Sequence, residues 1–71
     1  IDSKTKFQES AQEHANTTPE YRVISETGPD HNKDFEMGVY IGDELIATGK
    51  GSSKQKAEQE AAKKALKVKG W

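Results

Sequence analysis

The 71-residue sequence has no cysteine and no long apolar run. Without cysteine, a disulfide framework and any cysteine-ligated zinc site are excluded, and we expect a reducing, cytoplasmic setting. No apolar segment approaches the roughly 20 residues that span a bilayer, and no secretory signal is visible, so we expect no membrane partner. The length fits one domain over residues 1–71. Because the sequence starts at Ile1 rather than Met, we interpret this domain as excised from a longer parent.

Charge is unevenly distributed, although the formal net charge is only −1. Residues 1–49 hold 4 basic and 10 acidic residues, whereas residues 50–71 hold 7 basic and 2 acidic residues. A cationic C-terminal segment on an acidic body indicates an anionic partner. A solvated lysine-rich helix gives the same pattern, and charge alone does not separate these two interpretations.

The spacing of apolar residues predicts a first helix and then a strand. Asp2 is a suitable N-cap, and Phe7, Ala11 and Ala15 recur at four-residue intervals on one helix face. Residues 16–19 end this helix with a proline. Residues 21–25 are rich in β-formers and predict a strand, which a polar loop over residues 27–34 follows.

Two further strands and a second helix complete the expected order. Strict alternation over residues 35–41 predicts the second strand, Gly42 and Asp43 a tight hairpin, and residues 44–48 the third strand. For the last helix, either Ser52 or Ser53 can be the cap, and Gln55 completes a possible capping box with Ser52. The predicted apolar stripe of this helix is Ala57, Ala61, Ala62, Ala65 and Leu66, and Gly70 ends it.

The start of the last helix is the first candidate site. Lys54 and Lys56 occupy its first turn, where positive charge opposes the helix macrodipole. Lysines there indicate an anion site, since free backbone N–H groups and ammonium groups converge. The small residues 49–53 let the backbone approach a phosphate, but the G-x-x-x-x-G-K-[ST] spacing of a nucleotide loop is missing. A surface helix with an unfavourable first turn is the alternative.

Two more candidate regions carry weaker signals. Polar side chains share one face of the first helix, namely Thr5, Gln8, Glu9 and Gln12. Such groups suit the 2′-hydroxyls and base edges of the shallow minor groove of A-form RNA, although a solvated face looks the same. In the polar loop, Gly28 and Pro29 set a turn from which His31 would project into a groove. A loop histidine that is merely exposed fits equally well.

Taken in order, these motifs resemble the double-stranded RNA-binding domain, and are most similar to its C-terminal copy in bacterial ribonuclease III. The resemblance covers essentially the whole chain. It rests on residues 4–9, 19–21, 28–31, 35, 49–54, 57–59 and 61–62. It implies an α+β fold of order α-β-β-β-α, with two helices packed on one face of a three-stranded antiparallel sheet.

The resemblance also implies three contacts with double-stranded RNA. The first, in a minor groove, is assigned to Thr5, Gln8, Glu9 and Gln12. The second, in the next minor groove, is assigned to Pro29, Asp30 and His31. The third, on the phosphates of the intervening major groove, is assigned to Ser52, Ser53, Lys54 and Gln55. The broad family favours lysine where this chain has Gln55 and Glu58, although ribonuclease III copies resemble the chain at Glu58. Lys50 and Lys56 are candidates to compensate for the lost charge.

We therefore expect a non-catalytic, cofactor-free domain that supplies duplex affinity to a ribonuclease III. The Mg²⁺-dependent nuclease domain would lie in the same parent chain, and the parent is a candidate homodimer. No carboxylate cluster of that nuclease is recognisable, and the two histidines form no metal or triad set. The alternative is a protein-interaction domain of the same fold with weak or no RNA binding, which Gln55 and the acidic body favour.

Overall fold

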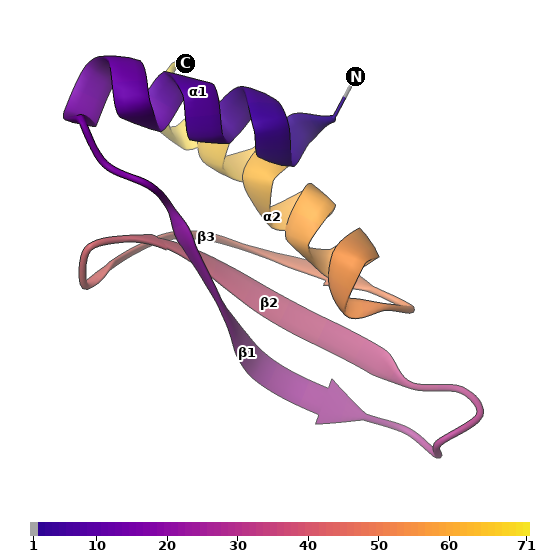
Figure 1. Cartoon of the computed structure of the whole chain (residues 1–71). Helices are drawn as coiled ribbons and strands as arrows, with labels where there is room; N and C mark the ends of the chain where they lie inside the picture. Colours follow the sequence, from indigo (N-terminus) through magenta and orange to yellow (C-terminus); the bar gives the residue numbers. More distant parts are fainter. Residues whose placement is uncertain (1) are drawn as a thin grey trace.

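The computed structural model describes residues 2–71 and has the α-β-β-β-α order that the sequence predicts. The elements are α1 (Ser3–Ala15), β1 (Glu20–Thr27), β2 (Asp34–Ile41), β3 (Glu44–Gly51) and α2 (Lys54–Lys69). The strands form one antiparallel sheet in the order β1-β2-β3. Both helices lie on the same side of this sheet (Figure 1). α2 covers β2 and β3 directly, whereas α1 packs mainly against α2.

Helix α1 begins at the predicted cap. The Asp2 carboxylate accepts hydrogen bonds from the N–H groups of Lys4 (2.9 Å) and Thr5 (3.3 Å), and Asn16 ends the helix in the left-handed conformation. Phe7 and Ala11 are buried, as the four-residue spacing predicts. The prediction for Ala15 is wrong, because its side chain is exposed in the last turn of α1.

The strands are longer than the sequence pattern indicates, because main-chain pairing continues into polar residues. β3 was expected to end near residue 48 but pairs with β2 as far as Gly51, opposite Phe35. The hairpin at Gly42 and Asp43 is confirmed, with Gly42 at a φ of 61°. The register shifts between Val23 and Ser25, which bends β1 at the edge of the sheet.

Helix α2 starts differently from the predicted capping box. Ser53, not Ser52, is the N-cap, and its Oγ accepts from the N–H of Lys56 at 3.1 Å. The box between Ser52 and Gln55 is wrong, because the Gln55 carbonyl oxygen accepts from the Lys4 ammonium instead. The predicted end at Gly70 is confirmed, where a φ of 72° suits glycine.

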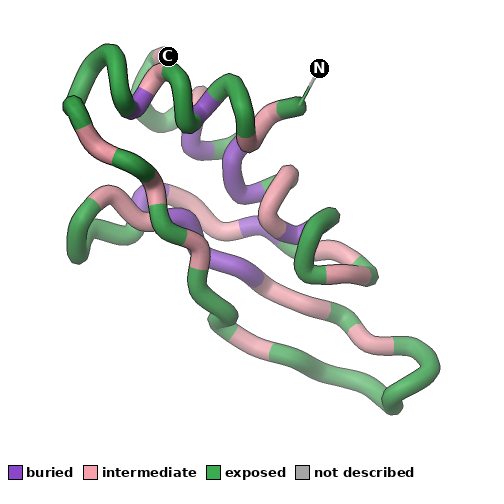
Figure 2. The backbone as a smooth tube through the Cα atoms, viewed as in Figure 1, coloured by how far each residue is buried: buried purple, intermediate pink, exposed green. Residues whose placement is uncertain are grey.

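The core lies between α2 and the inner face of the sheet (Figure 2). Four alanines of the predicted stripe are fully buried, whereas Leu66 is half-buried at its rim. Gly49 explains how closely α2 approaches β3: a Cβ there would lie 2.2 Å from the backbone nitrogen of Ala61. Fully buried residues are Phe7, Ala11, Val39, Ala57, Ala61, Ala62 and Ala65. No helix within residues 2–71 is long and apolar enough to cross a membrane.

Candidate nucleic-acid interface

The first turn of α2 is an exposed cationic helix start. Ser53 satisfies the N–H groups of Lys56, through its hydroxyl, and Ala57, through its carbonyl. The preceding N–H groups, those of Lys54 and Gln55, therefore remain for an outside acceptor. Lys54 is exposed, and no acidic residue lies in this turn to neutralise it. The free N–H groups, the helix dipole and the Lys54 ammonium all favour a phosphate at this point.

The structure places the polar face of α1 on the surface. Thr5, Gln8, Glu9 and Gln12 are all exposed, so they are available to a partner. The Gln12 amide donates to the hydroxyl of Thr18 at 2.8 Å, which ties the end of this face to the segment that enters β1. The face opposite, with Phe7 and Ala11, holds α1 against the rest of the molecule.

The loop between β1 and β2 forms a turn at the predicted residues. Gly28 has a φ of 93°, and a Cβ there would lie 2.5 Å from the carbonyl oxygen of Asn32, so glycine is required. The N–H of Asn32 donates to the carbonyl of Pro29 at 2.9 Å and closes the turn. Asp30 and His31 are exposed at its tip.

The start of α1, the start of α2 and the β1–β2 loop lie along one side of the molecule, and the rest of α1 extends away from that side (Figure 1). The start of α1 is at one end, the β1–β2 loop is at the other, and the start of α2 lies between them. The chain measures 40 Å along its longest axis. A cationic helix start between two polar projections suits a partner whose surface has two grooves separated by a ridge of phosphates.

Three of the candidate residues at this site, Ser53 as the N-cap and also Ser52 and Gln55, make contacts within the protein. The hydroxyl of Ser52 accepts from the Lys56 ammonium at 3.3 Å, so this lysine is held back along its own helix. Gln55 accepts from Lys4 at 3.1 Å. Lys54 is thus the one cation at the start of α2 that makes no contact inside the described residues 2–71.

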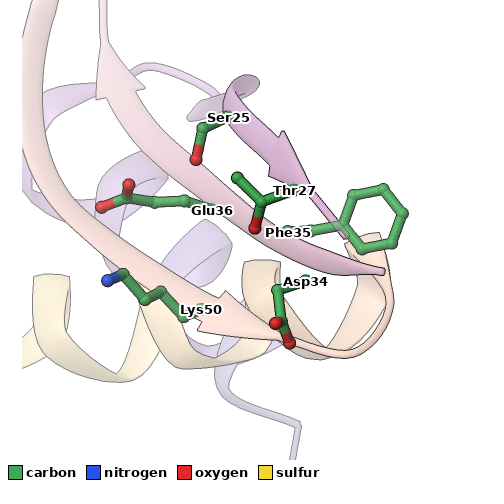
Figure 3. A pocket seen from close by; sticks show the side chains of 6 residues that line it. All are labelled: Ser25, Thr27, Asp34, Phe35, Glu36 and Lys50. Atoms are coloured by element: carbon green, nitrogen blue, oxygen red, sulfur yellow. The ribbon is translucent and has the colours of Figure 1, made fainter. Parts of the chain in front are cut away.

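Lys50 does not join this site, contrary to expectation. Its neighbours Gly49 and Gly51 both face α2, so the side chain of Lys50 projects from the opposite face of the sheet. There it is paired in register with Glu36. Figure 3 shows both side chains at a hollow of about 260 Å³ whose walls include Ser25, Thr27 and Asp34. Compensation for the charge lost at Gln55 therefore does not come from Lys50.

The sequence analysis missed a set of polar contacts that joins α1 to α2, which we name the interhelical clasp. It consists of Asp2, Lys4, Gln55, Glu58 and Gln59. The Lys4 ammonium contacts Glu58 Oε1 at 2.5 Å, and the Gln59 amide donates to Asp2 Oδ1 at 2.5 Å. The Gln59 carbonyl oxygen accepts from the backbone N–H of Lys4 at 3.2 Å. Partners more than 50 residues apart leave no periodic signal in the sequence.

The close contacts of the clasp shift the pKa values of two neighbouring groups, Asp2 and Tyr21. Hydrogen bonding, first from Gln59 and then from the first turn of α1, lowers the pKa of Asp2. The ring of Tyr21 lies under the Lys4 ammonium, 5.1 Å from it. Burial, together with the charges of Glu58 and Asp2, raises the pKa of Tyr21 to about 12. Within residues 2–71, no three acidic or histidine side chains come together as a possible metal site.

Comparison with known proteins identifies the class to which this fold and surface belong. The family model described as the double-stranded RNA binding motif matches residues 3–69. The chain therefore belongs to that family, as its motifs predict.

Individual relatives are ribonucleases. The chain is 51% identical over 67 residues to ribonuclease 3 of Nitratiruptor sp., covering 94% of this chain and 30% of that protein. It is 54% identical to ribonuclease 3 of Carboxydothermus hydrogenoformans, covering 94% and 28%. The solved structure of Dicer from Pichia stipitis is similar, with a TM-score of 0.73, 29% identity, and 93% and 32% coverage. The chain thus spans less than a third of the length of these relatives.

Proposed function

We propose that residues 1–71 form the substrate-binding domain of a ribonuclease III, which holds double-stranded RNA by its A-form shape. The observation that carries this proposal is the position of the cationic start of α2 between two exposed polar projections (Figure 1). Family membership and the ribonuclease 3 relatives support it. Domains of this family span about 16 base pairs and contact two minor grooves and the phosphates between them.

Each region is assigned the part of the duplex that suits its chemistry. Thr5, Gln8, Glu9 and Gln12 would meet 2′-hydroxyls and base edges in one minor groove. Pro29, Asp30 and His31 would enter the next. Ser52, Ser53, Lys54 and Gln55 would lie over the intervening major groove, with Lys54 on a phosphate. Because sugar, phosphate and groove shape vary little with sequence, binding should show little sequence preference.

Catalysis is assigned to a different part of the parent protein. The relatives are more than three times as long as the segment they share with this chain. We propose that the parent carries a Mg²⁺-dependent nuclease domain, assembles as a homodimer and is cytoplasmic. Two-metal cleavage needs carboxylates that hold both ions. On this proposal the isolated chain binds duplex RNA without cleaving it.

The test is a competition for the bound duplex. A labelled RNA duplex of about 20 base pairs is long enough for one domain of this kind. Unlabelled RNA duplex should displace it, whereas B-form DNA of the same sequence and single-stranded RNA should not at equal concentration. Displacement by the DNA duplex would refute recognition of the A-form. Absence of any binding to the RNA duplex would favour the protein-interaction alternative.

A further inference from the structure

Two of the proposed RNA-binding regions, the polar face of α1 and the first turn of α2, lie on different helices. The distance between them therefore depends on how α1 packs on α2. α1 packs mainly against α2 rather than on the sheet. Near the middle and far end of this interface the contacts are apolar, from Phe7 and Ala11. At the end next to Lys54 the contact is the interhelical clasp. The clasp therefore lies where the first turn of α1 meets the first turns of α2.

Glu58 makes this end of the interface sensitive to charge. It lies four residues after Lys54, so the two side chains share one face of α2. A carboxylate beside a phosphate site repels the phosphate unless a cation neutralises it. Lys4 supplies that cation from α1, and the pair is largely withdrawn from solvent, with 27% of the Lys4 side chain and 18% of the Glu58 side chain exposed.

We propose that the interhelical clasp positions the two helices for duplex recognition, with Lys4 neutralising Glu58 and fixing the start of α1. This inference rests on the function proposed above. Lys4 acts through Glu58 and Gln55 and does not itself contact RNA. Gln55 and Glu58 both accept from the Lys4 ammonium, so one lysine of α1 joins two side chains in the first turns of α2.

The test compares two lysines of α1 that carry the same charge. Lys4→Met breaks the clasp, whereas Lys6→Met removes an exposed ammonium that has no contact within the described residues. We expect Lys4→Met to weaken RNA-duplex binding about five- to tenfold, as coupled groups at a shared site do, and Lys6→Met by less than about twofold. Lys4→Arg keeps the cation and should bind within about twofold of the parent chain.

The salt dependence of binding separates positioning from direct contact. A lysine that binds phosphate contributes about one unit to the log–log slope of affinity against salt, so Lys54→Met should lower the slope by about one. Lys4→Met should leave the slope within about half a unit of the parent value. Thermal melts of every variant show whether the fold is retained. If Lys4→Met melts below the assay temperature, Lys4→Gln, which keeps a hydrogen-bond donor, takes its place.

Three results would overturn the proposal. Lys4→Met could bind as tightly as Lys6→Met, which would leave the clasp no part in recognition. It could instead lose one unit of slope, as Lys54→Met should, which would make Lys4 a phosphate ligand. Finally, the parent chain and Lys6→Met could both fail to bind duplex RNA. The proposed function would then be refuted, and with it the role of the clasp in RNA binding. The first two results leave the proposed function standing.

Discussion

The two ends of the interface between α1 and α2 are held by opposite kinds of contact. At one end, next to the start of α2, one ion pair and the amide hydrogen bonds of the clasp join the helices. At the other end Trp71 closes the interface. Its ring lies 5.5 Å from that of Phe7 and 5.0 Å from that of His14, on which it stacks at 13°.

This difference separates stability from recognition. The apolar end buries Phe7 completely, and buried apolar area is the main source of folding free energy. The Lys4–Glu58 ion pair is largely withdrawn from solvent, so the cost of removing both charges from water offsets much of their attraction. The polar end therefore adds little to stability, but it lies where the proposed ligand binds. A small domain has little apolar area to bury, so it gains by keeping its apolar contacts away from the binding surface.

The largest effect on the fold is expected at the apolar end. Phe7→Ala would remove the largest fully buried side chain and leave a cavity against Trp71 and the alanines of α2. Such substitutions cost about 3–5 kcal/mol, which is a large part of the stability of a small domain. Circular dichroism melts should show a steep loss of melting temperature. A melt close to that of the parent would show that α1 is not anchored through Phe7.

The largest effect on binding with no loss of fold is expected at Lys54. Lys54→Glu places a negative charge at the start of α2, where the helix dipole favours it but Glu58 on the same face repels it, so the melting temperature should stay close to that of the parent. Affinity for the RNA duplex should fall by about tenfold or more, because hydrogen bonds to charged groups contribute about 1.5–3 kcal/mol. Fluorescence anisotropy and thermal melts measure the two effects separately. Binding equal to that of the parent would refute the phosphate contact.

Periodicity in the sequence predicted the elements well where one rule applied over a long segment. The alanines of α2 recur at helical spacing, and the alternating residues of β2 recur at strand spacing, so both elements were predicted almost to their ends. Ala15 fits the helical spacing equally well, yet its side chain is exposed, and in the last turn of α1 it is His14 on which Trp71 stacks. Spacing shows which face is apolar, but it does not show how far the partner surface reaches.

The candidate interface was only partly predictable, for a related reason. Lys54 could be singled out as a candidate because a positive charge in the first turn of a helix opposes the helix dipole. The roles of Gln55 and Ser52 could not be predicted, because the hydrogen-bond partners of both side chains become neighbours only in the folded chain. Gln55 was expected to cap its own helix and instead binds Lys4, 51 residues away. Lys50 was a candidate to compensate for the charge lost at Gln55, but strand alternation turns it to the opposite face.

The smallest expected effect is the pH dependence of the polar end. Hydrogen bonds from Gln59 and the first turn of α1 lower the pKa of Asp2 below its ordinary value of 3.8. A carboxyl with a lowered folded-state pKa stabilises the fold fully above about 3.8, and this contribution is lost as the pH falls through the folded-state value.

Asp2→Asn keeps an oxygen that can cap α1 and accept from Gln59, but it does not titrate. Between about pH 5 and pH 2, the parent should therefore lose melting temperature slightly faster than Asp2→Asn, with the gap opening only below about 3.8. Parallel curves for the two proteins across this range would mean that the contacts at Asp2 do not favour its charged form.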